Sequence, residues 1–401
     1  MRIERLLTNA RIATMTPGDT PYGVIEDGAI GLYGDRIAWV GPRDEAPEAL
    51  FTDNLEGRWV TPALIDCHTH LIFAGDRSDE YERRLAGESY TDIAKSGGGI
   101  ARTVEATRKA GAAELASGAL SRLDAFIAEG VGTVEIKSGY GLNYDSELAM
   151  LKAARATGLA SGMRIVTTLL AAHSIPPEYK GRSGAYIDEV CIPLIREAAR
   201  EGLADAVDAY CEKIAFSAEE TRRLFIAARG AGLPVKLHAD QFSDLGGARL
   251  VAEFDGLSAD HIEYTTEDGI AAMAKAGTVG VLLPGAFYAT GETQKPPVDA
   301  MRAAGVPMAV ATDANPGSSP MLSILTAANM ACTLFGLTVE EALAGITRQA
   351  ARALGLQNEI GTIEKGRKAD LAIWDIERPA ELVQWIGRRP LHGRILGGEW
   401  L

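Results

Sequence analysis

The chain has 401 residues, of which 47% are hydrophobic and 23% charged, so we expect a large folded core divided into two structural units. A formal charge of −14 without any basic run excludes a nucleic-acid-binding surface and leaves a small molecule as the predicted partner. The N-terminus does not resemble a signal peptide and no stretch of about 18 apolar residues occurs, which predicts a cytoplasmic protein that does not enter membranes.

Both ends of the chain read as short strands separated by turns. At the N-terminus the strand-like segments are residues 2–13, 29–33 and 36–40, and at the C-terminus they are residues 361–366, 369–374 and 394–401. No helix of ordinary length fits the first sixty residues. We therefore predict one small β-sandwich domain assembled from residues 1–58 and 360–401.

Between these ends, short apolar runs alternate with Ala-, Glu- and Arg-rich stretches of helical period, which is typical of repeated β-α units. The eight candidate strands are residues 60–68, 131–136, 163–173, 206–212, 234–240, 257–264, 278–284 and 307–313. Eight units predict an α/β fold, a (β/α)8 TIM-like barrel over residues 59–359, with an open doubly wound sheet as the alternative.

A triple glycine occurs in the long interval between the first and second candidate strands, in the segment KSGGGI at residues 95–100. The segment lacks the Lys-Ser/Thr that follows the glycines of a phosphate-binding loop, and it does not join a strand directly to a helix. A mobile loop near an active site is the better interpretation.

Five of the six histidines fall at or near the C-terminal ends of candidate strands, the face where barrel enzymes gather their catalytic groups. In a strand, alternation places His68 and His70 on one face together with Asp66, and Cys67 on the other. Two imidazoles on one face suit a shared metal ion, although an HxH pair can also be a pair of core or surface histidines.

The third and fourth ligand candidates are His238 and Asp313, each at the point where an apolar strand gives way to a polar loop. The sequence Asn-Pro-Gly soon after Asp313 also allows this residue to be a helix cap or turn residue. Imidazole and carboxylate ligands suit one divalent or trivalent metal ion per chain, Zn²⁺ or Fe³⁺, with an open position for water.

This pattern resembles the amidohydrolase superfamily, whose metal site uses HxH on the first barrel strand, His on the fifth, often His on the sixth and Asp on the eighth. The resemblance assigns these positions to His68 and His70, to His238, to His261 and to Asp313. The segment GTIEKGRKADL at residues 361–371 is similar to the returning C-terminal strand motif of the superfamily. The resemblance covers essentially the whole chain.

Within that superfamily, five segments in order resemble the imidazolonepropionase family. They are DCHTHLIFAGDR (66–77), KSGGGIARTV (95–104), EIKSGYGL (135–142), TLLAAH (168–173) and TDANPGS (312–318). The resemblance implies a homodimer that hydrolyses 4-imidazolone-5-propanoate to N-formimidoyl-L-glutamate in histidine degradation.

The same resemblance implies which residues bind an anionic substrate. Arg77 would hold the propionate group in two hydrogen bonds, with a surface ion pair as the alternative. Substrate-binding roles also follow for Tyr90, Tyr140 and His173, and for the loop residues Asn315, Gly317 and Ser318. Packing remains the alternative for Tyr140, and an ordinary turn remains the alternative for the three loop residues.

One residue departs from some members of the family, because Gln241 stands where they carry a glutamate. An amide cannot accept and return a proton, so we assign proton transfer to Asp313 with assistance from His261, and orientation of the substrate ring to Gln241. Two other functions stay open: a deaminase acting on another small heterocycle, which Gln241 disfavours, and a catalytically silent structural relative, which would be expected to lack metal ligands.

Overall fold

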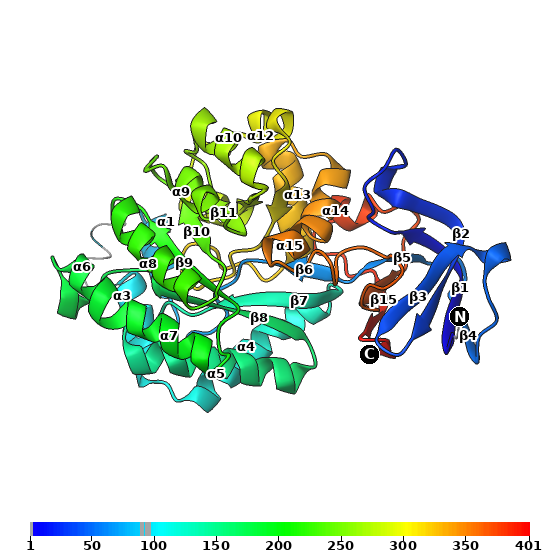
Figure 1. The fold of residues 1–401 in the computed structure, drawn as a ribbon, viewed down its shortest axis with the longest axis horizontal. Helices are drawn as coiled ribbons and strands as arrows, with labels where there is room; N and C mark the ends of the chain where they lie inside the picture. The colour runs from blue at the N-terminus through cyan, green and yellow to red at the C-terminus, as the bar shows by residue number, and fades with distance from the viewer. Residues whose placement is uncertain (1–2, 89–91, 93–97) are drawn as a thin grey trace.

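The structure is a computed structural model that describes residues 3–88, 92 and 98–401, and its largest feature is a parallel sheet of eight strands (Figure 1). Each strand pairs with the next one along the chain. In chain order the strands are β6 (Leu64–Asp66), β7 (Val131–Lys137), β8 (Arg164–Ala172), β9 (Ala206–Cys211), β10 (Lys236–Ala239), β11 (Ser258–His261), β12 (Val279–Leu282) and β13 (Met308–Val310).

The sheet closes into a barrel just beyond the ends of its first and last strands. Thr69 and Ala314 form a parallel bridge, and the His70 N–H donates to the Ala314 carbonyl over 3.0 Å. The Asp313 N–H donates to the His68 carbonyl, also over 3.0 Å. The predicted (β/α)8 fold is confirmed, and the chain segments that carry the candidate ligands are the ones that close it.

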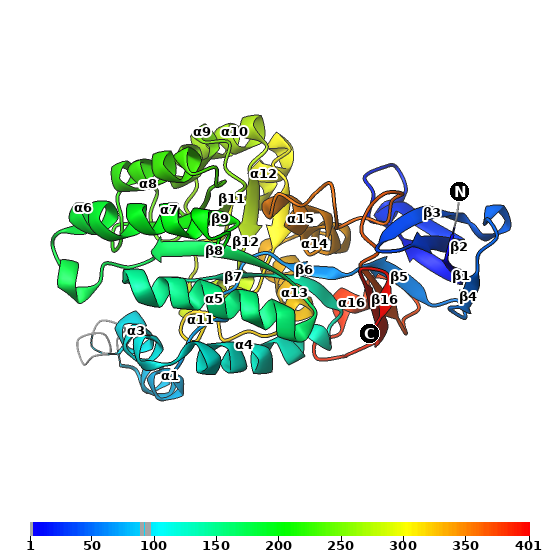
Figure 2. The ribbon, with the colours of Figure 1, turned by 60° about the horizontal axis from the view of Figure 1, so that its bottom comes forward.

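Helices cover the outside of the barrel, as Figures 1 and 2 show for α4, α5, α7 and α8 around strands β7 to β11. Some of them begin with sequence signals: Ser217 and Glu220 form a reciprocal capping box at the start of α8. The helices are α1 (Ser78–Leu85), α3 (Ile100–Lys109), α4 (Ala112–Ile127), α5 (Tyr144–Ser161), α6 (Ser183–Tyr186), α7 (Ile192–Arg200), α8 (Ala218–Gly230), α9 (Gly247–Glu253), α10 (Glu267–Ala276), α11 (Pro284–Thr290), α12 (Val298–Ala304), α13 (Ile324–Phe335), α14 (Val339–Gly345), α15 (Arg348–Ala353) and α16 (Glu381–Gln384). In the part of the chain that the structure describes, no helix combines the length and apolar character needed to span a membrane.

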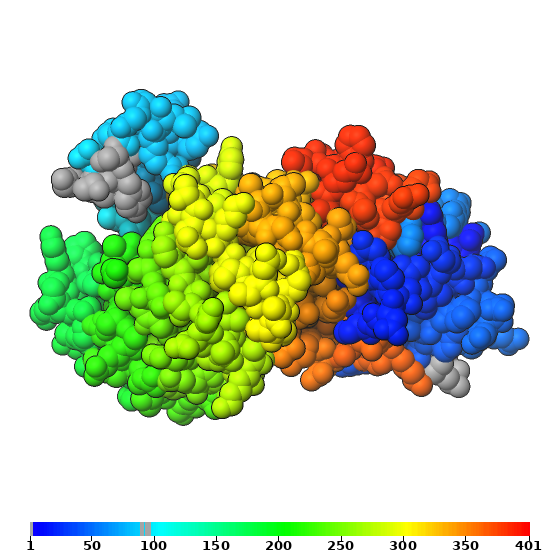
Figure 3. Space-filling view, turned by 90° about the horizontal axis from the view of Figure 1, so that it is seen from above, coloured from blue at the N-terminus to red at the C-terminus, as the bar shows by residue number. Residues whose placement is uncertain are grey.

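A second, mixed sheet is built from both ends of the chain, as predicted, and Figure 3 shows N-terminal and C-terminal residues side by side at one end of the molecule. Its strand order is β16-β15-β14-β5-β1-β2-β3, with β4 also paired to β1. The strands are β1 (Arg5–Ala13), β2 (Val24–Tyr33), β3 (Arg36–Pro42), β4 (Phe51–Asn54), β5 (Trp59–Pro62), β14 (Leu371–Trp374), β15 (Leu391–Leu396) and β16 (Glu399–Trp400). The limits of the two domains stay a prediction.

Two expectations about strands are wrong. The run at residues 60–68 is not one strand, because β5 pairs with β1 and β14 in the terminal sheet whereas β6 pairs with β7 in the barrel. Every residue of β5 and of β6 is buried, so the hydrophobicity of the run does not show where the chain passes from one sheet to the other. Residues 361–366 form turns that bond to the terminal sheet through the Ile363 and Gly366 N–H groups, but they do not form a strand.

The inside of the barrel has an apolar layer that reaches across non-neighbouring strands. Ile65 of β6, Val166 of β8 and Val281 of β12 belong to one buried cluster, together with Ala350 of α15. Since β8 and β12 are not adjacent in the sheet, side chains that pack together from both strands must cross the interior. Side chains therefore fill this level of the barrel, and we expect a site that substrate can reach at the carboxyl ends of the strands.

Candidate metal and substrate site

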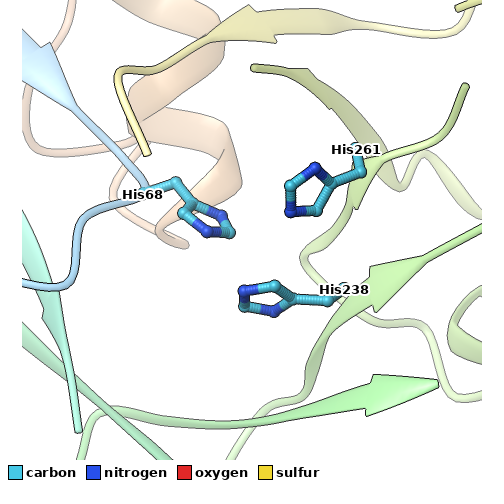
Figure 4. Close-up of side chains that lie close together, drawn as sticks. All are labelled: His68, His238 and His261. Atoms are coloured by element: carbon cyan, nitrogen blue, oxygen red, sulfur yellow. The ribbon is translucent and has the colours of Figure 1, made fainter. Parts of the chain in front are cut away.

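Five buried side chains meet at the carboxyl end of the barrel. His68 and His70 follow β6, His238 lies in β10, His261 ends β11 and Asp313 follows β13. Figure 4 shows the rings of His68, His238 and His261 converging from three different elements. The predicted position of these residues at the strand ends is thus what the structure shows.

The ring nitrogens lie at distances that suit ligands of one ion. The Nε2 atom of His70 is 3.3 Å from the Nε2 atom of His68 and 3.4 Å from that of His238. Asp313 Oδ1 lies 3.3 Å from His70 Nε2 and 3.4 Å from His68 Nε2. Two ligands bound tetrahedrally at about 2.0–2.1 Å are about 3.4 Å apart, so the spacing fits Zn²⁺ or a similar ion.

Two overlapping groups of these residues could hold a metal ion. One consists of His68, His70 and Asp313, and the other of His68, His238 and His261. The two groups share His68, and His70 Nε2 lies 3.4 Å from His238 Nε2, so the five side chains form one cluster. The structure therefore brings together all four predicted ligands and places His261 beside them.

The protonation of His70, His261 and Asp313 suits metal binding. Burial, which outweighs the hydrogen bond that Asp313 accepts, lowers the pKa of His70 to about 4, and burial lowers the pKa of His261 to about 3. Both imidazoles are therefore neutral at pH 7, as a ligand must be. Burial alone would raise the pKa of Asp313, but hydrogen bonds to His68 and His70 hold it well below its usual value, so the carboxylate is ionised.

The backbone is strained at the same place. His261, Ile262 and Asp313 have φ angles of 79°, 66° and 52°, in the left-handed region that non-glycine residues rarely occupy. Each such residue costs about 1–3 kcal/mol, and such residues cluster at functional sites. At these residues the chain bends, which directs the end of β11 and the segment after β13 toward the cluster.

Two carboxylates that the sequence analysis missed orient the histidine rings. Asp260 Oδ2 lies 2.6 Å from His68 Nδ1, and Asp208 Oδ2 lies 3.0 Å from His238 Nδ1. A carboxylate partner on one ring nitrogen fixes the tautomer and turns the other nitrogen toward the ion. The signal in the sequence is an acidic residue inside an otherwise apolar strand.

Asp66 does not join the cluster, although alternation predicted that it would share the face of His68 and His70. Its Oδ2 atom accepts a hydrogen bond from the Thr312 hydroxyl over 2.6 Å, and Oδ1 accepts from the His68 and Thr312 N–H groups. The chain leaves β6 at Asp66, and strict alternation ends there. Asp66 instead ties the first barrel strand to the segment after the last one.

Arg77 lies against the loop that follows Asp313. Its guanidinium group is so close to Gly317 that a Cβ atom there would collide with it. Nε and one terminal nitrogen of Arg77 donate to Glu80 Oε2 over 3.0 and 2.8 Å, and Glu80 Oε1 accepts from the Gly99 N–H. Glu80, which the sequence analysis missed, thus holds one edge of the guanidinium group.

Tyr140 and His173 line the side of the cluster next to His70. The His70 and His173 rings are nearly parallel with centroids 5.2 Å apart, and the Tyr140 ring lies 5.4 Å from His173. Burial, reinforced by Asp313, raises the pKa of Tyr140, so its hydroxyl keeps its proton and can donate it in a hydrogen bond. His173 Nδ1 lies 3.0 Å from the Gly139 carbonyl.

The side chain of Asn315 is used to build a turn. Its Oδ1 atom accepts from the Gly317 and Ser318 N–H groups over 2.9 and 2.8 Å, while Nδ2 donates to the Asp313 carbonyl over 2.7 Å and to the Ser318 hydroxyl over 3.0 Å. The turn interpretation therefore accounts for Asn315. Direct contact of Gly317 and Ser318 with substrate stays a prediction.

Gln241 is fixed by a residue that the sequence analysis missed. The Tyr210 hydroxyl donates to Gln241 Oε1 over 2.8 Å, which leaves the amide N–H groups as the donors that Gln241 can present. Of the other sequence predictions, Tyr90 and residues 95–97 of the glycine-rich segment lie outside the described residues.

Comparison with known proteins shows the family. The model of the amidohydrolase family matches residues 59–401. The chain belongs to the amidohydrolase family. It is 76% identical over 401 residues to a protein named imidazolonepropionase from Maricaulis maris and 59% identical over 400 residues to one from Rhizorhabdus wittichii, covering 99–100% of each chain.

The fold of this amidohydrolase is also that of solved structures. An adenosine deaminase from Xanthomonas campestris, solved with bound zinc, superposes with a TM-score of 0.73 at 20% identity and covers all of this chain and 93% of its own. The resemblance to the family is confirmed, and with it the enzyme class: the chain is a metal-dependent hydrolase of C–N bonds.

Proposed function

We propose that this protein hydrolyses 4-imidazolone-5-propanoate to N-formimidoyl-L-glutamate, a step of histidine degradation. The name of its full-length relatives supports this reaction. The observation that carries it in the structure is the position of Arg77, which lies against Gly317 and near enough to Tyr140 to act on it electrostatically. Tyr140 lies next to His70, so a cation that can bind a carboxylate is close to the histidine cluster. A cyclic amide with a propionate side chain needs both a cation to bind its carboxylate and a metal-binding cluster to act on its amide.

One Zn²⁺ or Fe³⁺ ion would be held by His68, His70, His238 and Asp313. The nitrogen spacing of 3.3–3.4 Å and the neutral imidazole of His70 fit such an ion. When bound, the ion supplies positive charge that polarises water and carbonyl oxygen and brings the pKa of water toward neutrality.

The substrate would be oriented by groups on the other side of the cluster. The free edge of the Arg77 guanidinium group would donate two hydrogen bonds to the propionate carboxylate. Tyr140 would donate its hydroxyl proton to the same carboxylate or to the ring, and His173 would contact the ring from beside His70. Gly317, Ser318 and Tyr90 complete the proposed set; because the Gly317 and Ser318 N–H groups donate to Asn315, contact from this loop would come from the Ser318 hydroxyl and from the Gly317 backbone surface.

The proton transfers follow from the protonation states. Water adds to the ring carbonyl carbon, and Asp313 takes the proton that water loses. As the bond from that carbon to the ring nitrogen breaks, Asp313 returns the proton to the nitrogen. His261, neutral with a pKa of about 3, would donate a hydrogen bond to the carbonyl oxygen as negative charge develops, and Gln241 would hold the ring through its amide N–H groups. The carbonyl carbon becomes the new carboxylate of the product.

The remaining features of the proposal concern assembly and location. We expect a homodimer with a single metal ion in each chain, in the cytoplasm, without nucleic acid as a partner. Size-exclusion chromatography with light scattering checks the dimer.

The test is turnover of 4-imidazolone-5-propanoate by enzyme loaded with Zn²⁺ or with iron. N-formimidoyl-L-glutamate should accumulate without release of ammonia, and His68→Ala should be inactive. Release of ammonia from a heterocycle would instead favour the deaminase function. Failure of the loaded enzyme to open the ring, or equal rates for the variant, would contradict the proposal.

A further inference from the structure

Below the histidines, a layer of five charged side chains fills the barrel. They are Glu135 and Lys137 of β7, Asp208 of β9, Lys236 of β10 and Asp260 of β11, and each side chain is at most 1% exposed. The ion pairs join β7 to β9, β10 and β11, so they cross the interior of the barrel. Burying charge is costly unless every group is paired, and apolar side chains would fill this space at least as stably.

Two carboxylates of this layer contact the histidine rings on the side away from the cluster. Asp260 lies 2.6 Å from His68 Nδ1 and Asp208 lies 3.0 Å from His238 Nδ1. Asp208 Oδ1 also accepts from the His238 N–H over 3.2 Å. Because a neutral imidazole with its proton on Nδ1 has its lone pair on Nε2, the hydrogen bond to Asp260 selects the tautomer of His68 that presents Nε2 to the cluster. The Asp208 charge, 3.0 Å from His238 Nδ1, favours the same tautomer of His238 by electrostatic attraction.

Lys137 links the two carboxylates. Its ammonium nitrogen lies 2.8 Å from Asp208, 2.9 Å from Glu135 and 3.8 Å from Asp260. Asp208 and Asp260 would repel one another across the interior, and the Lys137 ammonium group, which lies near both carboxylates, offsets part of that repulsion. The orientation of His68 and that of His238 therefore depend on the same cation.

Lys236 adds a contact to the backbone. Its ammonium group donates to the Cys67 carbonyl over 2.9 Å and lies 2.8 Å from Glu135 and 3.8 Å from Asp260. Cys67 directly precedes His68, so Lys236 fixes the main chain as well as the carboxylate partner of that histidine. Glu135 is held from a third side by the Thr168 hydroxyl at 2.5 Å.

We propose that Lys137, Lys236 and Glu135 are positioning residues that hold Asp208 and Asp260 against His68 and His238 and so set the affinity of the site for its metal ion. None of the three is a predicted metal ligand, and none is predicted to touch the substrate. The inference rests on the metal site of the proposed function and concerns residues to which the sequence analysis gave no role.

The decisive variant is the double substitution Lys137→Met with Glu135→Gln, which removes the link without changing the net charge of the layer. Asp208→Asn is the companion variant, because it keeps the shape and alters one partner only. The matched control is Arg164→Met with Asp370→Asn, which removes the 2.8 Å ion pair between β8 and the terminal sheet.

Zn²⁺ affinity is measured by competition with a chromophoric chelator, and the visible absorption of the Co²⁺-loaded protein reports the ligand arrangement. Loss of a partner of a metal-bound histidine lowers affinity about 10–100-fold, so we expect that loss and an altered Co²⁺ spectrum in both variants. The control should keep both properties. Unfolding of the metal-stripped proteins is followed alongside, since a role in folding alone would lower stability and leave the affinity of the folded protein unchanged.

Unchanged Zn²⁺ affinity and Co²⁺ spectrum in Asp208→Asn, or in the folded double variant, would overturn the inference. If the double variant does not fold, Asp208→Asn decides. If the wild-type protein binds Zn²⁺ and opens the ring, and the variants bind Zn²⁺ with the same affinity, only this inference is refuted. A wild-type protein that binds neither zinc nor iron refutes the proposed function and this inference together.

Discussion

The barrel and the terminal sheet use their interiors differently. Aliphatic side chains fill the centre of the terminal sheet, among them Leu7, Ile12, Ile30, Val60 and Ile373, and ion pairs such as Arg58 with Asp375 lie at its exposed rim. In the barrel, fully buried lysines and carboxylates lie directly beneath the histidine cluster. One region is packed for stability and the other carries costly polar groups.

This difference between the two interiors indicates that the active site lies in the barrel. Buried charge costs stability, and the structure places buried ion pairs in the barrel directly beneath His68 and His238, next to the left-handed backbone of His261 and Asp313. The terminal sheet joins the two ends of the chain through β5 and β14. Substitutions in the two regions should therefore separate stability from activity.

The largest expected effect comes from removing a histidine of the cluster. His68→Ala deletes one predicted ligand and removes the hydrogen-bond partner of the buried Asp260 carboxylate. Loss of charge stabilisation worth several kcal/mol predicts a fall in kcat/KM of about 10³-fold or more, with loss of bound metal measured by elemental analysis. His392→Ala, at an exposed histidine of the terminal sheet, is the matched control. If the control loses as much activity as His68→Ala, the separation of the two regions fails.

Next in size is the pH dependence of the metal-free protein. Burial lowers the pKa of His70 from 6.5 to about 4, so the unfolded chain binds the proton more tightly than the folded one. This contribution to the free energy of unfolding is fully present above pH 6.5 and is lost as pH falls toward 4, a change of about 3 kcal/mol.

The measurement is urea unfolding of chelator-treated protein between pH 7 and pH 4, compared with His70→Asn and with His392→Asn. The difference between wild type and His70→Asn should shrink as pH falls, whereas His392→Asn should follow the wild type. A difference that stays constant with pH would show that His70 is not held neutral by its surroundings.

A smaller effect is expected for the substrate-binding arginine. Arg77→Lys keeps the charge but removes the paired donors, and a hydrogen bond between charged groups is worth about 1.5–3 kcal/mol, so kcat/KM should fall about 10–100-fold. The measurement is steady-state hydrolysis of 4-imidazolone-5-propanoate, with Arg43→Lys, at the residue that follows β3, as control. With a substrate that lacks the propionate, wild type and Arg77→Lys should become equal; a persistent gap would place Arg77 elsewhere in the reaction.

The smallest effect should come from the apolar centre of the terminal sheet. Ile373→Val removes one buried methylene and should cost about 0.5–1.5 kcal/mol in urea unfolding, with kcat and KM unchanged. Leu159→Ala, at a leucine that is 90% exposed on α5, should change neither quantity. A loss of activity in Ile373→Val at saturating metal would show that the terminal sheet also shapes the site.

Much of this fold could be predicted because its signals are local. The β-α period located each barrel strand to within a few residues, and apolar runs that end in His or Asp located His238 and Asp313, whereas the family resemblance assigned His261. The change of sheet between β5 and β6 could not be predicted, since both strands are buried and differ only in the partner they pair with. Alternation also misplaced Asp66, because the chain leaves the strand there.

The residues of the site also divide into those that the sequence predicted and those that only the structure revealed. The sequence by itself determined the barrel, the sheet built from both termini and the candidate ligands, because periodicity, strand ends and segments similar to a known family are all visible along one chain. Only the tertiary structure decided the partners: Tyr210 on Gln241, and Lys137 between Asp208 and Asp260. These contacts join residues on different barrel strands and loops, and no spacing along the sequence records which of them will face one another across the interior.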